Sequence, residues 1–127
     1  MADDVRTVLV ADADEGTRSL VGLTLGTESY RIVQADDTES TLGAIAAHKP
    51  DLLLVDVGLP GAGGLRISKS VKAQPETSHA KVILLFAKSQ PVDEDAGADS
   101  GVDQYVAKPF TSFGLLKKVN EVMGTGE

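Results

Sequence analysis

The sequence contains no cysteine. Disulfide bonds, cysteine-ligated zinc and thiol nucleophiles are therefore excluded, and the absence is consistent with a cytoplasmic location. No apolar run approaches the roughly 20 residues that cross a bilayer, and no basic segment precedes the first apolar run, as one does in a secretory signal peptide. Basic residues are the minority: 12 against 19 acidic residues give a net charge of −7, which argues against a nucleic-acid-binding surface.

The 127 residues, of which 42% are hydrophobic, suffice for one domain with a buried core. Five short apolar runs predict strands, at residues 5–11, 30–35, 51–56, 81–87 and 102–107. Five further segments predict helices, at residues 15–28, 36–48, 64–74, 90–101 and 111–123. This alternation predicts an α/β fold in which helices cover both faces of a parallel sheet. We expect the domain to span residues 1–123, with a frayed tail at 124–127.

Some helices also carry signals for their ends and buried faces. Asp36 and Glu39 resemble a capping box. The helix that follows is expected to bury Leu42, Ile45 and Ala46. The last helix is expected to present an apolar face that consists of Phe113, Leu116, Val119 and Met123. Acids dominate residues 90–101, which predicts that the fourth helix is short, mobile or frayed.

The stretch that organises the chain is Asp51–Gly64, with the sequence DLLLVDVGLPGAGG. Its apolar run, Leu52–Val55, predicts a strand that is buried on both faces. Asp56 follows at once and a glycine-rich loop comes next. Ligands collect at the carboxyl ends of strands in open α/β sheets. Asp56 is therefore expected to be a carboxylate that is held rigidly and can be reached from solvent.

Two further charged residues end predicted strands. Asp12 follows the first strand and Lys108 the fifth, and we expect the ends of strands one, three and five to lie side by side. Neighbouring carboxylates repel, and a lysine or a metal cation relieves the repulsion. Two carboxylates with a carbonyl oxygen suit Mg²⁺. A carboxylate beside that ion can attack phosphorus and form an acyl phosphate.

Four segments resemble the receiver domain of two-component response regulators: VLVADAD, LLLVDVGLPGAGGL, VILLFAKS and GVDQYVAKPF. The resemblance implies a flavodoxin-like (βα)5 three-layer sandwich with strand order 2-1-3-4-5. It implies phosphoryl transfer to Asp56 from a histidine kinase or a phosphotransfer domain. It also implies that Lys108 contacts the phosphate, that Gly58 offers its carbonyl to Mg²⁺, that Tyr105 is a switch residue and that the bond before Pro109 is cis.

Two positions depart from the pattern of that family. Ala13 stands where the family has a second acid that binds the metal directly, so we expect Mg²⁺ binding to be weakened. Asp14 is one residue away, where its side chain points differently. Phe86 replaces a small hydroxyl residue that contacts the phosphoryl group in the family. Because Tyr105 moves into the space that this contact opens, Phe86 is expected to obstruct the switch.

Two other functions stay open beside a phosphoacceptor domain that is not an enzyme. One is a degenerate receiver, which binds proteins without phosphorylation; Ala13 and Phe86 both favour it. The other is a phosphatase that forms an aspartyl phosphate, but its motif needs a second aspartate where this chain has Gly58. By family resemblance, downstream partners would bind the surface of the fourth helix, fifth strand and fifth helix. The chain is not expected to bind nucleic acid or membranes.

Overall fold

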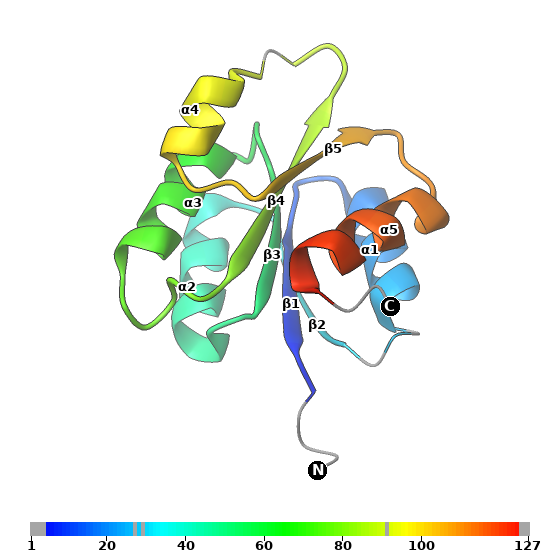
Figure 1. Cartoon of the computed structure of the whole chain (residues 1–127), viewed down its shortest axis with the longest axis horizontal. Coiled ribbons are helices and arrows are strands. Elements are labelled where there is room, and N and C mark those ends of the chain that lie inside the picture. Colours follow the sequence, from blue (N-terminus) through cyan, green and yellow to red (C-terminus); the bar gives the residue numbers. More distant parts are fainter. Residues whose placement is uncertain (1–4, 27, 29, 91, 125–127) are drawn as a thin grey trace.

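A computed structural model describes residues 5–26, 28, 30–90 and 92–124 (Figure 1). Its strands are β1 Thr7–Ala11, β2 Arg31–Ala35, β3 Leu52–Asp56, β4 Lys81–Ala87 and β5 Gln104–Lys108. Its helices are α1 Glu15–Gly26, α2 Thr38–His48, α3 Gly64–Ala73, α4 Glu94–Asp99 and α5 Ser112–Met123. All strands are parallel and lie in the order β2-β1-β3-β4-β5. The predicted α/β class and flavodoxin-like strand order are confirmed.

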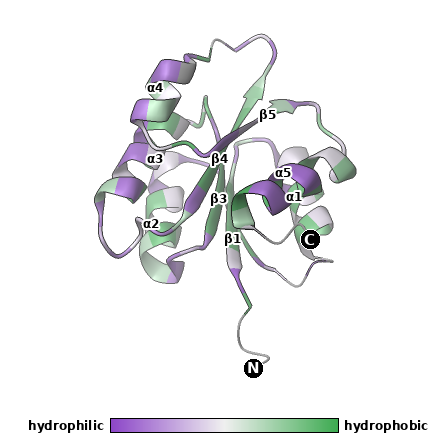
Figure 2. Ribbon diagram, viewed as in Figure 1, coloured by the Kyte–Doolittle hydropathy of each residue, from purple (hydrophilic) through white to green (hydrophobic). Residues whose placement is uncertain are grey.

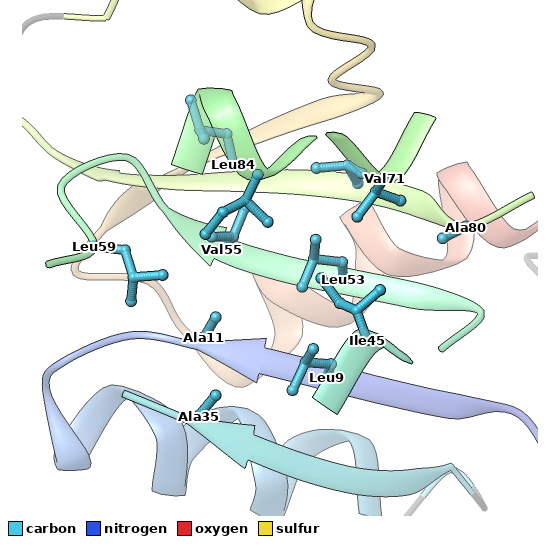
Figure 3. Packing of buried hydrophobic residues seen from close by; sticks show 12 residues of the cluster. Leu9, Ala11, Ala35, Ile45, Leu53, Val55, Leu59, Val71, Ala80 and Leu84 are labelled. Carbon is cyan, nitrogen blue, oxygen red and sulfur yellow. The ribbon is translucent and has the colours of Figure 1, made fainter. Parts of the chain in front are cut away.

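The molecule has three layers, because helices cover both faces of the sheet. In Figure 1, α1 and α5 lie on one side of the sheet, and α2, α3 and α4 lie on the other. Successive side chains of a strand point to opposite faces, so β1, β3 and β4 contribute to two separate cores. The core under α1 and α5 includes Val8, Val10, Leu52, Leu54, Ile83 and Leu85. The opposite core includes Leu9, Leu53, Val55, Val82 and Leu84 (Figure 3).

The inner strands are apolar along their whole length for the same reason. All five residues of β1 and all five of β3 are buried, and Asp56 is the single charged residue among them. Figure 2 shows β1 and β3 as mainly hydrophobic, between helices that mix hydrophilic and hydrophobic residues. The charged residue therefore lies where the buried layer reaches the edge of the sheet.

The predicted capping box of α2 is wrong by one residue. Asp37 is the N-cap, and its carboxylate accepts a hydrogen bond from the Ser40 backbone N–H at 2.8 Å. The predicted buried face is partly correct: Ile45 is buried as expected, but Thr41 is the other buried residue of α2, and Leu42 and Ala46 are exposed. The Thr41 hydroxyl donates to the Asp37 carbonyl, so it enters the core without losing a hydrogen bond.

The predicted apolar face of α5 is only partly correct. Val119 is buried, as expected, and Leu116 and Met123 are partly buried against the same core. Leu115 is buried as well, whereas Phe113 is 81% exposed. Thr111 caps the helix through a hydrogen bond from the Gly114 N–H. This cap fixes where α5 begins and therefore which face of the helix turns toward the core. The Phe113 side chain lies on the opposite face, in solvent.

The acidic segment before β5 forms the predicted short helix, α4, which has six residues. Asp93 caps it by accepting hydrogen bonds from the backbone N–H groups of Asp95 and Ala96. At the end of the chain, Gly124 caps α5 in the left-handed region, and the rest of the predicted frayed tail lies outside the described residues. None of the helices in the described part of the chain is long and apolar enough to cross a bilayer.

Candidate functional site

Three charged side chains meet at the carboxyl edge of the sheet. Asp12 follows β1, Asp56 ends β3 and Lys108 ends β5. The Lys108 Nζ lies 2.8 Å from Asp12 Oδ2 and 2.8 Å from Asp56 Oδ1. One ammonium group therefore bridges two carboxylates that come from different strands.

The strand order explains why a lysine makes this bridge. The expectation that strands one, three and five lie side by side is wrong for the fifth, because β4 separates β5 from β3. Lys108 is paired in register with Ala87 of β4, so its side chain must cross the end of that strand to reach Asp56. The flexible four-carbon stem of a lysine has the length to do so.

Burial makes the bridge energetically important. Asp12 is 2% exposed and Asp56 is 7% exposed. Two carboxylates cannot be withdrawn from water at this proximity without a compensating charge. Burial alone lowers the pKa of Lys108, but the hydrogen bond to Asp12 and the negative charges of Asp12 and Asp56 outweigh it and raise the pKa above 10.5. The lysine is thus charged at neutral pH.

Local hydrogen bonds fix the orientation of Asp12. Its Oδ1 accepts a hydrogen bond from the Asp14 N–H at 2.9 Å, and its own N–H donates to the Ala35 carbonyl of β2 at 3.1 Å. The Arg18 guanidinium donates to the Asp12 carbonyl at 2.7 Å. The other carboxylate oxygen, Oδ2, is left to face Lys108.

Asp56 is held from its own loop. Its Oδ2 accepts a hydrogen bond from the Gly58 N–H at 2.9 Å. Its Oδ1 is buried and contacts the Lys108 ammonium as an ion pair at 2.8 Å, at an angle that does not make a regular hydrogen bond. One oxygen of the Asp56 carboxylate is therefore hydrogen-bonded to the backbone, and the other contacts the Lys108 ammonium.

The donor groups suit a magnesium ion, but the protein offers only a small number of ligands for it. Asp12 and Asp56 supply two carboxylates beside Gly58, whose carbonyl is the third predicted ligand, and Mg²⁺ often binds through one or two carboxylates while it keeps several waters. Ala13 adds no donor. The described residues include no cluster of three or more acids or histidines that could hold a metal.

Asp14 does not replace the missing acid at position 13. Its Oδ2 accepts hydrogen bonds from the N–H of Thr17 at 2.9 Å and from the Thr17 hydroxyl at 2.8 Å. These bonds lower the pKa of Asp14. The Asp14 carboxylate is therefore hydrogen-bonded to the first turn of α1. This agrees with the expectation that an acid one residue after Ala13 points in a different direction.

The two expected switch residues lie on the same face of the sheet. Phe86 is half-buried near the end of β4 and is paired in register with Ala107. Tyr105 is paired with Leu84, and it packs against the core under α2, α3 and α4. A Cβ atom on Gly97 of α4 would overlap the Tyr105 hydroxyl, so that glycine lets the tyrosine lie against α4.

Sequence reasoning missed one residue at this edge, Gln90. Its side-chain carbonyl accepts a hydrogen bond from the Ala87 N–H, and its amide nitrogen lies beside Gly58. No motif marks this glutamine, because its position depends on the turn that follows β4. The peptide bond between Lys108 and Pro109 is cis, as the family resemblance implied.

Comparisons with known proteins agree with this architecture. The family model of the response regulator receiver domain matches residues 8–120. The phosphate regulon transcriptional regulatory protein PhoB of Klebsiella pneumoniae is 31% identical over 118 residues, which are 93% of this chain and 52% of PhoB. The chain therefore spans about half the length of the curated relatives that it matches.

Solved structures show the same fold. The chemotaxis response regulator CheY4 of Vibrio cholerae has a TM-score of 0.85 and 25% identity, with 93% of this chain and 98% of that one covered. A response regulator from Thermotoga maritima has a TM-score of 0.81 and 25% identity, with 95% and 99% covered. Family model, relatives and fold agree: the chain belongs to the response regulator receiver domains of two-component signalling.

Proposed function

We propose that this domain accepts a phosphoryl group on Asp56 from a phosphohistidine of a histidine kinase or phosphotransfer domain. The observation that carries the proposal is the Lys108 ammonium, which lies 2.8 Å from both Asp56 and Asp12 at the open edge of the sheet. A fixed cation beside a reactive carboxylate stabilises charge on an incoming phosphoryl group. Such a domain is a signalling phosphoacceptor and not an enzyme with a separate substrate.

In the transfer, a carboxylate oxygen of Asp56 attacks phosphorus while the bond from phosphorus to the histidine nitrogen breaks. The electron pair of that bond stays with the imidazole, which takes up a proton. Lys108 pairs with the phosphoryl oxygens as the Asp56 carboxylate becomes an acyl phosphate, a mixed anhydride. Asp12, Asp56 and the Gly58 carbonyl would hold Mg²⁺, which supplies further charge neutralisation.

The alternative is a receiver that binds its partners without phosphorylation. Ala13 and Phe86 favour this alternative, because both replace residues that the family uses in the reaction. In either case we propose a cytoplasmic protein that presents α4, β5 and α5 to a downstream partner.

Incubation with acetyl phosphate and Mg²⁺ should add one phosphoryl group, which intact-mass spectrometry detects. Asp56→Asn should abolish the adduct completely, since an amide oxygen is a far poorer nucleophile than a carboxylate. Asp36→Asn is the matched control, because Asp36 is exposed and its carboxylate accepts a hydrogen bond from the Ser40 hydroxyl, and it should leave the adduct unchanged.

A wild-type chain without adduct would support the phosphorylation-independent alternative. That conclusion needs a second measurement, because a small donor such as acetyl phosphate can fail to react where a phosphohistidine of a partner protein would. Backbone amide shifts in the NMR spectrum should therefore be followed while Mg²⁺ is added. No adduct together with no Mg²⁺-dependent shift at Asp12 and Asp56 contradicts the proposal.

Replacing Ala13 by aspartate should strengthen Mg²⁺ binding by at least about tenfold, because ligand-sphere changes commonly alter metal affinity by this amount. The variant adds a third carboxylate directly after Asp12, where the family has its second acid. Mg²⁺ titration followed by NMR or calorimetry measures the change. Ala46→Asp adds the same charge at an exposed site on α2 and should leave the affinity unchanged. An equal affinity in the Ala13 variant and the wild type contradicts the placement of the metal.

A further inference from the structure

Two hydrogen bonds, one from its backbone and one to its side chain, join Gln90 to Ala87 at the end of β4. The Gln90 N–H donates to the Ala87 carbonyl at 2.9 Å, which closes a tight turn. The Gln90 side-chain carbonyl, Oε1, accepts a hydrogen bond from the Ala87 N–H. The turn therefore folds the side chain back onto the strand end from which it started.

The Ala87 N–H faces the side of β4 on which β3 and Asp56 lie. In a parallel ladder, the carbonyl of one residue and the N–H of the residue two further on face the same neighbouring strand. The Leu85 carbonyl accepts from the Val57 N–H at 2.9 Å, so the Ala87 N–H also faces the β3 side of β4. That position lies just beyond Asp56, the last residue of β3.

The amide nitrogen of Gln90 lies over the loop that follows Asp56. A Cβ atom on Gly58 would be 2.7 Å from Gln90 Nε2 and 3.3 Å from Asp56 Oδ2. The nitrogen and the carboxylate oxygen thus border the same small space above Gly58. Since Gly58 has no side chain, this space stays open to a group attached to Asp56.

We infer that Gln90 is a positioning residue for the phosphoryl group on Asp56, an inference that rests on the proposed function. Its Oε1 is anchored by the Ala87 N–H, and its Nε2 donates a hydrogen bond to a phosphoryl oxygen. The turn after β4 thereby supplies the polar contact that the phenyl ring of Phe86 cannot make. A hydrogen bond to a charged acceptor is among the stronger kinds.

Glutamate at position 90 separates this role from a structural one. Gln90→Glu keeps the length of the side chain and the oxygen that accepts from Ala87, but it replaces the donor by a negative charge. The initial rate of Asp56 phosphorylation by acetyl phosphate with Mg²⁺ should fall by about tenfold. Gln90→Ala, in which water can fill the space, should slow the reaction by less than Gln90→Glu.

The matched control is Gln74→Glu, which makes the same charge change at an exposed glutamine at the end of α3. Its rate should equal that of the wild type, and the thermal midpoints of both glutamate variants should agree. If Gln90→Glu reacts as fast as Gln74→Glu, the assignment of Gln90 is overturned and the proposed function stands. If the wild type takes up no phosphate and also shows no Mg²⁺-dependent shift at Asp12 and Asp56, both are overturned.

Discussion

Replacing Lys108 by methionine is expected to lower the free energy of unfolding by about 3 kcal/mol at pH 7, because breaking a buried ion pair leaves an uncompensated charge. The variant keeps the apolar stem but removes the ammonium that lies 2.8 Å from Asp12 and from Asp56. Both carboxylates stay buried, with side-chain exposures of 3% and 10%. They then face each other without a cation. Urea denaturation at pH 7 measures the loss.

Lys117→Met is the matched control for this prediction. Lys117 is exposed on α5, and surface substitutions of this kind change stability by less than about 0.5 kcal/mol. A double variant that adds Asp56→Asn to Lys108→Met should recover at least about 1 kcal/mol, because one of the two repelling charges is gone. Equal stability of the Lys108 and Lys117 variants would show that the bridge does not stabilise the fold.

The pH dependence of the same pair of proteins follows from the raised pKa of Lys108. A group whose pKa is higher in the folded than in the unfolded state stabilises the fold fully below its unfolded value, here 10.5. That contribution is lost as the pH rises through the folded value. The wild type should therefore lose stability above pH 10.5 more steeply than Lys108→Met.

The sequence predicts the sheet and the charged bridge because both depend on where apolar runs end. A strand buried on both faces needs an unbroken apolar run, and Leu52–Val55 supplies one that ends at Asp56. Parallel strands bring their carboxyl ends to one edge, so Asp12 and Lys108 follow from the same logic. The sequence does not predict that the Lys108 side chain crosses the end of β4, because strand order is a property of the whole sheet.

Local rotation and loop geometry are harder to predict, for two different reasons. Asp36 and Asp37 can both cap a helix, and Asp37 is the one whose carboxylate accepts a hydrogen bond from the Ser40 N–H. Gln90 reaches the site through a turn closed by its own N–H. A turn of this kind leaves no periodic signal, and a glutamine in a loop has no preferred function.

Gly64→Ala is expected to destabilise the protein by about 2 kcal/mol, since inserting an atom into a well-packed core forces neighbours apart. Gly64 begins α3 and is buried against the end of β3. A Cβ atom there would lie 2.6 Å from the Asp56 carbonyl oxygen and 2.9 Å from the Leu84 side chain. Because the nearer contact is backbone, a change of rotamer cannot relieve it, and α3 must move away from the strand that carries the acceptor.

Gly43→Ala provides a control of opposite sign. Gly43 is exposed in the interior of α2, and a Cβ atom there would meet nothing within 4 Å. Alanine should therefore stabilise the protein by about 0.5–1 kcal/mol through helix propensity alone. Denaturant midpoints of the two variants should shift in opposite directions. If Gly64→Ala is instead as stable as the wild type, α3 does not hold the carboxyl end of β3, and the rigidity of Asp56 must come from Lys108 and Gly58.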